Sequence, residues 1–120
     1  MREGKTSFHG ILKTKMDELA HLTYKATREF PKDELFGIVS QLRRAVLSVI
    51  LNYTEGYARS RKAVMINFLE ISYGSLKETK YLLHFSWKEK YLSEESYKKL
   101  IILAEEIGAM LWRTIKNLQS

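Results

Sequence analysis

Apolar residues recur every three or four positions along most of the chain, which is the spacing of one face of an α-helix. Four such stretches, separated by short polar segments, predict helices over about residues 7–29, 34–58, 62–90 and 94–118. Helices joined by loops this short pack as neighbouring antiparallel elements. The pattern therefore predicts one all-α domain over residues 1–120, an antiparallel up-and-down four-helix bundle.

Local signals indicate where these helices begin and end. Pro31 ends the first helix, because proline disfavours a helical residue before it and has no backbone N–H to donate. Asp33 can cap the second helix, and Ser93 is a favourable N-cap for the fourth. Glu94 follows Ser93 and interacts well with the positive end of the helix dipole. Gly56 weakens the last turns of the second helix, so its corner is expected within 57–62.

The second predicted helix is apolar over a wide arc. Ile38, Ala45, Leu47 and Leu51 lie outside its main stripe, and they widen the apolar sector to roughly 200°, against ~100° for an ordinary surface helix. One interpretation is that this helix is the most buried in a compact bundle. We favour the other, in which Ile38, Leu47 and Leu51 contact further copies of the chain, since apolar patches often mark interfaces and self-association usually closes into a symmetric ring or dimer.

Composition narrows the class of protein. A chain of 120 residues can bury a core of its own, and its lack of cysteine excludes disulfides, thiolate metal sites and cysteine nucleophiles. The longest strongly apolar run, Ala45–Leu51, is far shorter than the roughly 20 residues that cross a bilayer. The polar start, Met1–Thr6, does not resemble a secretory signal. We therefore expect a cytoplasmic protein with no membrane partner.

The sequence offers no evident catalytic or metal site. Di-iron bundles need two Glu-x-x-His pairs, whereas this chain has only Glu18-x-x-His21, which lies off the apolar stripe and is better explained as a solvated face. The other histidines, His9 and His84, have no partner at ligand spacing, and Gly-rich phosphate loops and nucleophile elbows are absent. We expect no enzyme activity, metal or cofactor, unless several subunits build a site together.

A basic segment suggests a binding role. Between Leu35 and Leu69 there is one acidic residue, Glu55, in a chain of net charge +6. The five basic residues of this segment are Arg43, Arg44, Arg59, Arg61 and Lys62. Arginine makes forked contacts with phosphate, and Tyr53 or Tyr57 could stack on unpaired bases, although Tyr53 is better explained as core. The alternative is a solvated face in which Glu55 pairs with Arg59 at i,i+4.

Gly74 and Ser75 interrupt the third predicted helix. Glycine inside a helix costs about 1 kcal/mol relative to alanine. Close approach of a neighbouring helix would offset that cost, so we predict a packing site at Gly74 and Ser75.

An ordered set of residues resembles the four-helix bundle family of 23S rRNA-intervening sequence proteins. The set comprises Phe30-Pro31, Gln41-x-Arg43-Arg44-Ala45, Ser48, Asn52-x-x-Glu55-Gly56, Arg59, Phe68-Leu69, Gly74-Ser75 and Glu78, extended by Tyr24, Thr27, Tyr91-Leu92-Ser93 and Glu106-Ile107-Gly108. The resemblance covers almost the whole chain. It implies an antiparallel four-helix subunit and, as in related proteins, a pentameric barrel.

The resemblance also bears on function. The same fold is used by the accessory variability proteins of diversity-generating retroelements, which are basic pentamers that bind nucleic acid and partner a reverse transcriptase. Carried over, Arg43, Arg44 and Arg59 are the matching basic positions. Asn52 and Glu55 belong to the narrow polar strip that the second predicted helix keeps beside its apolar arc, together with Arg43, Arg44 and Ser48. We expect a non-enzymatic, homo-oligomeric nucleic-acid-binding accessory protein, with structured RNA as the favoured ligand. The competing hypothesis is a protein–protein adaptor, for example a partner of a reverse transcriptase.

Overall fold

The computed structural model describes residues 7–120, and within this range it contains four α-helices and no strand. They are α1 (Phe8–Thr27), α2 (Ser40–Tyr57), α3 (Lys62–Lys88) and α4 (Glu94–Gln119). The prediction of an all-α chain with four helices is confirmed. Residues 1–6, where the sequence indicated no secretory signal, lie outside the described residues.

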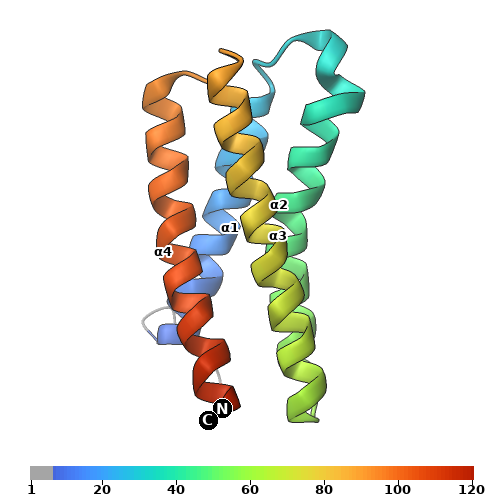
Figure 1. The fold of residues 1–120 in the computed structure, drawn as a ribbon, viewed down its shortest axis with the longest axis vertical. Coiled ribbons are helices and arrows are strands. Elements are labelled where there is room, and N and C mark those ends of the chain that lie inside the picture. Colours follow the sequence, from blue (N-terminus) through green and yellow to red (C-terminus); the bar gives the residue numbers. More distant parts are fainter. Residues whose placement is uncertain (1–6) are drawn as a thin grey trace.

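The four helices lie side by side along the long axis of a molecule measuring 44 × 26 × 22 Å (Figure 1). Contacts join α1 to α2 and α4, and α3 to the same two helices. The α2–α3 corner lies at the same end of the molecule as the start of α1 and the end of α4, and the other two connections lie at the opposite end (Figure 1). None of the helices in the described part of the chain is long and apolar enough to cross a membrane.

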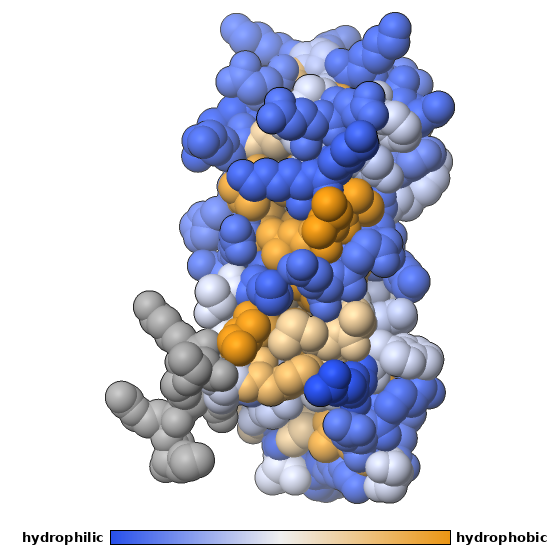
Figure 2. Space-filling view, turned by 90° about the vertical axis from the view of Figure 1, so that its left-hand side faces the viewer, coloured by the Kyte–Doolittle hydropathy of each residue, from blue (hydrophilic) through white to orange (hydrophobic). Residues whose placement is uncertain are grey.

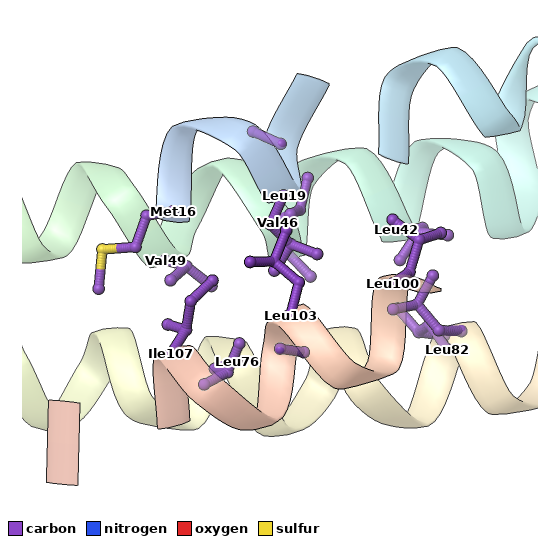
Figure 3. Close-up of a cluster of buried hydrophobic side chains, with 14 of the residues drawn as sticks. Met16, Leu19, Leu42, Val46, Val49, Leu76, Leu82, Leu100, Leu103 and Ile107 are labelled. Carbon is purple, nitrogen blue, oxygen red and sulfur yellow. The ribbon is translucent and has the colours of Figure 1, made fainter. Parts of the chain in front are cut away.

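The core fills the space between the four helices (Figure 3). Each helix contributes fully or almost fully buried apolar side chains, including Met16, Leu19, Leu42, Val46, Val49, Leu76 and Ile107. Burying each such side chain stabilises the fold by about 1.5–3 kcal/mol relative to leaving it exposed. Tyr53 is also fully buried, as predicted. Ser72, another fully buried residue, donates a hydrogen bond from Oγ to the Val49 carbonyl at 2.6 Å, so its polar atom is paired.

The wide apolar arc of α2 is partly absorbed by this core. Ile38, just before α2, is only 8% exposed and Ala45 only 4%. Ile38 therefore packs within the subunit and is not available on the surface, contrary to the prediction that it contacts another copy. Leu51, by contrast, is 61% exposed, and Leu47 is half-buried.

The chain enters α2 irregularly, whereas the sequence predicted a continuous helix from residue 34. A short 3₁₀ turn (Lys32–Glu34) and a π-type turn (Leu35–Val39) precede Ser40, with non-helical dihedral angles at Gly37 (φ −106°, ψ −110°). The Glu34 carboxylate accepts hydrogen bonds from the Tyr91 hydroxyl at 2.9 Å and from the Ile38 amide at 3.4 Å. These contacts, made partly by a residue distant in sequence, hold the entry segment.

A consequence of this entry is that Leu35 is 48% exposed, and its neighbour Phe36 is 93% exposed. At the connection between α3 and α4, the predicted helix ends lie close to the observed ones. α3 ends at Lys88 rather than at residue 90, and Lys90 has a positive φ of 66° where the chain turns toward α4. Ser93 caps α4 as predicted, its Oγ accepting from the Ser96 amide at 3.1 Å.

Gly56 permits a close approach between helices, whereas Gly74 does not. A Cβ added at Gly74 would meet no atom within 4 Å, whereas one added at Gly56 would lie 3.2 Å from the Met65 carbonyl oxygen and 3.1 Å from Leu69 Cδ2. The prediction of close packing at Gly74 is therefore wrong. Its neighbour Ser75 does join α3 to α2, through a hydrogen bond of 2.7 Å between its Oγ and that of Ser48.

Candidate nucleic-acid interface

Arg43 projects from α2 toward the end of α1. Its Nε donates to Thr27 Oγ1 at 2.9 Å, Nη2 donates to the Tyr24 carbonyl at 3.4 Å, and the guanidinium lies 4.6 Å from the Tyr24 ring centroid. Thr27 Oγ1 in turn donates to the Thr23 and Tyr24 carbonyls, both at 3.0 Å. The structure thus places Arg43 as a tie between α1 and α2, and its role in phosphate binding stays a prediction.

Arg44 has a different environment although it is the next residue. Its side chain is exposed and borders a surface hollow on the outer side of α2 and α3. Polar side chains line that hollow beside it, namely Gln41, Ser48, Ser75 and Glu78. Asn52 closes the polar strip, donating from Nδ2 to the Ser48 carbonyl at 2.9 Å and to Ser48 Oγ at 2.8 Å. Arg44 is thus the accessible member of the Arg43–Arg44 pair.

The remaining predicted residues lie at the α2–α3 corner. Arg59 forms an ion pair with Glu55, as the sequence alternative anticipated, and its guanidinium lies 4.9 Å from the Phe68 ring centroid. Arg61 occupies the N-cap position of α3 without capping it through its side chain, and Lys62 is the first residue of the helix. Both are exposed, and neither forms an ion pair within residues 7–120.

The structure does not bring these five residues into one patch. Arg44 lies near the start of α2, and Arg59, Arg61 and Lys62 follow its end. At 1.5 Å per residue, Arg44 and Arg59 are separated by about 22 Å along the helix axis. The basic residues of this segment therefore lie in two separate places, Arg43 and Arg44 near the start of α2 and the others at its end.

Histidine and carboxylate side chains show no metal-binding arrangement in the described part of the chain. His21 is exposed and lies 3.4 Å from Asp17, one turn earlier on α1. His9 Nδ1 is 2.5 Å from the Tyr53 hydroxyl. His84 is exposed and lies beside the rings of Trp87 and Tyr97, at centroid distances of 5.8 and 6.2 Å.

Apolar surface that was not predicted from the sequence also lies between α1 and α4. A hollow between these helices is lined by Leu22, Ala26 and Leu100, together with Lys25, Glu29, Ser96 and Lys99. Figure 2 views the molecule from this side and shows apolar areas in the middle of a largely hydrophilic face. On α4, the large apolar side chain of Ile102 is 58% exposed.

Two aromatic residues that were not predicted from the sequence as a site, Tyr73 on α3 and Trp112 on α4, are each followed by a lysine one turn later. Lys77 Nζ lies 5.3 Å from the Tyr73 ring centroid, and Lys116 Nζ lies 4.2 Å from the Trp112 ring centroid. The signal in the sequence was the i,i+4 spacing of Tyr73 with Lys77 and of Trp112 with Lys116. Which of these pairs share a surface depends on how α3 and α4 pack, and this is not visible in the sequence.

Known proteins match this chain over most of its length. Residues 11–113 match the family described as 23S rRNA-intervening sequence protein. A solved structure from Bacteroides thetaiotaomicron, a protein of unknown function from the S23 ribosomal protein family, matches with a TM-score of 0.83 and 24% identity. The match covers 92% of this chain and 99% of that one, and at this identity it shows the shared fold alone. No curated protein matches the sequence significantly.

Proposed function

The chain belongs to the 23S rRNA-intervening sequence protein family, and from this premise we propose that it is a non-enzymatic nucleic-acid-binding accessory protein. Its favoured ligand is structured RNA, bound through backbone phosphates in the cytoplasm. Phosphate contacts from arginine and lysine supply affinity without reading sequence. Such a function needs basic side chains that are exposed and are not already held by acidic side chains of the protein.

The observation that supports this proposal is an excess of positive charge that the protein's own acidic side chains do not neutralise. The chain has a net charge of +6. Within residues 7–120, only four lysines and arginines form ion pairs: Lys15, Arg59, Lys80 and Lys98. Arg44, Arg61 and Lys62 are exposed and outside these pairs, so they can exchange water and counterions for phosphate.

Assembly would multiply these sites. We propose that the up-and-down subunit forms a ring-like homo-oligomer, with a pentamer favoured, through an α2 surface that includes Leu47 and Leu51. Leu51 is 61% exposed, and an apolar side chain in this position gains by being covered. Repetition of the α2–α3 corner around a ring would raise the number of phosphates bound at once, which strengthens binding.

A matched pair of variants tests the proposal. With purified, nuclease-treated protein and a labelled RNA hairpin, Arg44→Gln should weaken binding roughly five- to eightfold near 0.1 M salt, the effect of losing one phosphate contact. Arg43→Gln should instead lower the free energy of unfolding by about 1–2 kcal/mol, because it breaks hydrogen bonds to a charged donor, with a smaller effect on RNA affinity. Lys99→Gln, exposed on α4, is the charge control. A wild-type protein that binds no RNA contradicts the proposal.

One observation favours the adaptor hypothesis as a second candidate. Phe36 is 93% exposed beside the exposed Leu35, and an exposed aromatic side chain of this kind is common at protein interfaces. An adaptor, such as a reverse-transcriptase partner, would retain one host protein in a nuclease-treated extract and lose it on Phe36→Ser. Retention that is unchanged in this variant would remove Phe36 from such an interface.

A further inference from the structure

The surface along the contact between α3 and α4, the α3–α4 seam, carries aromatic rings to which the proposed function assigns no role. These helices lie side by side (Figure 1) and contact each other. The rings of Tyr73 on α3 and Trp112 on α4 have centroids 5.5 Å apart. Trp112 is 47% exposed, so half of a large apolar ring is open to water.

Lysines surround this ring pair. The amino group of Lys116 lies 4.2 Å from the Trp112 centroid, and that of Lys77 lies 5.3 Å from the Tyr73 centroid. Lys80 is one turn further along α3. Lys77, Lys80 and the two rings line a hollow in the surface, together with the small residues Gly108 and Ala109 of α4.

A second ring pair lies further along the same seam. Trp87 of α3 and Tyr97 of α4 are stacked, with centroids 4.8 Å apart and planes 5° from parallel. Lys88 Nζ lies 5.3 Å from the Trp87 ring centroid. From Tyr73 to Trp87, α3 rises about 21 Å, and Lys77 and Lys80 fall between the two pairs.

We propose that this α3–α4 seam binds the unpaired nucleotides of an RNA. Alternation of aromatic rings with basic groups is the arrangement that holds single-stranded nucleic acid, because every base has a face that can stack and every nucleotide has a phosphate. Bases stack on Trp112 and Tyr73, and phosphates contact Lys77, Lys80 and Lys116. The inference rests on the proposed function and extends it, since structured RNA exposes unpaired loops that the sites at Arg44 and the α2–α3 corner do not read.

Glu105 is the acidic residue that lines the hollow. Its substitution is expected to strengthen RNA binding, whereas the substitutions of the aromatic and basic residues are expected to weaken it. Its carboxylate accepts from Lys80 Nζ at 2.8 Å, and this hydrogen bond holds the pKa of Glu105 below its usual range. At neutral pH the side chain is therefore an anion, which repels phosphate and competes with it for Lys80. Removal of this charge should strengthen binding at the seam.

The experiment measures binding of a short fluorescent oligouridylate to the full chain across a range of salt concentrations. Trp112→Ala should weaken binding roughly 5- to 150-fold, the loss expected for one stacked base, and Trp112→Phe should restore much of it. Lys77→Gln should reduce the slope of log K against log salt by about 0.7, and Glu105→Gln should tighten binding. Ile102→Ala and Lys99→Gln, both on α4 and outside the ring pairs, should bind as wild type does.

A second readout follows Trp112 directly. In the Trp87→Phe variant, Trp112 is the remaining tryptophan, and its emission should be quenched when the oligonucleotide is added. Wild-type affinity in Trp112→Ala, Lys77→Gln and Glu105→Gln would overturn this inference while leaving the proposed function intact, provided that the protein still binds the RNA hairpin. A wild-type protein that binds neither RNA overturns both. If Trp112→Ala fails to fold, an unchanged affinity in both folded Glu105→Gln and folded Lys77→Gln decides against the seam.

Discussion

At the scale of single residues, Gly56 and Gly74 interrupt long helices for different reasons. A Cβ at position 56 would press against Leu69 and the Met65 carbonyl, whereas a Cβ at position 74 would meet open space. We expect Gly56→Ala to lower the free energy of unfolding by about 1–3 kcal/mol through overpacking. Gly74→Ala should raise it by about 0.5–1 kcal/mol, because alanine loses less backbone entropy in a helix.

The two glycine variants serve as controls for each other. Urea unfolding followed by circular dichroism gives both free energies, and the sign of the change separates the two positions. Equal destabilisation by both substitutions would mean that Gly74 is packed against a neighbour, in the subunit or in an assembly. The sequence could not distinguish these positions, since helix spacing does not reveal the distance to the helix opposite.

At the scale of elements, the α3–α4 connection is fixed to the entry of α2 by one side-chain pair. The Tyr91 hydroxyl donates to the Glu34 carboxylate, and this hydrogen bond, with a smaller contribution from burial and nearby carboxylates, raises the pKa of Tyr91 above its usual value of 10.0. A raised pKa in the folded state gives stability that is fully present below the unfolded-state pKa and lost as pH rises through the folded one.

The expected result is alkaline loss of stability that depends on Tyr91. Between neutral pH and a pH above 10, the urea midpoint of the wild-type protein should fall further than that of Tyr91→Phe, which has no hydroxyl to ionise. Tyr91→Phe itself should be less stable than wild type at neutral pH. Midpoints that fall in parallel for the two proteins would show that the bond contributes nothing to the pH dependence.

Sequence patterns located the ends of some helices closely and missed the irregular entry to α2. Signals within a few residues of the chain, such as Pro31 and the Ser93 cap, located helix ends to within about two residues, which is the usual uncertainty of such boundaries. The irregular entry at 35–39 was missed because its cause, the Glu34–Tyr91 contact, joins distant positions. For the same reason the sequence grouped Arg43 with Arg44, although α1 engages only the former.

At the scale of the whole molecule, the proposed assembly depends on exposed apolar surface on α2. Leu51→Glu places a charge where Leu51 is 61% exposed, so the folded subunit should tolerate it, while an apolar contact between copies should not. We expect light scattering to give a multiple of the subunit mass for wild type and a smaller mass for Leu51→Glu. Thr14→Glu, at an exposed position on α1, is the control, and an unchanged mass in Leu51→Glu would place the contact elsewhere.

The most direct test of the central claim is the salt dependence of wild-type binding to a structured RNA. The protein should bind saturably at low salt, and log K should fall linearly with log salt concentration, with a slope of about 0.7–0.9 for each phosphate contacted. A slope corresponding to several phosphates would support binding through exposed basic side chains such as Arg44, Arg61 and Lys62. No binding at low salt, or an affinity that salt does not change, would contradict the proposal that this protein recognises RNA through its phosphates.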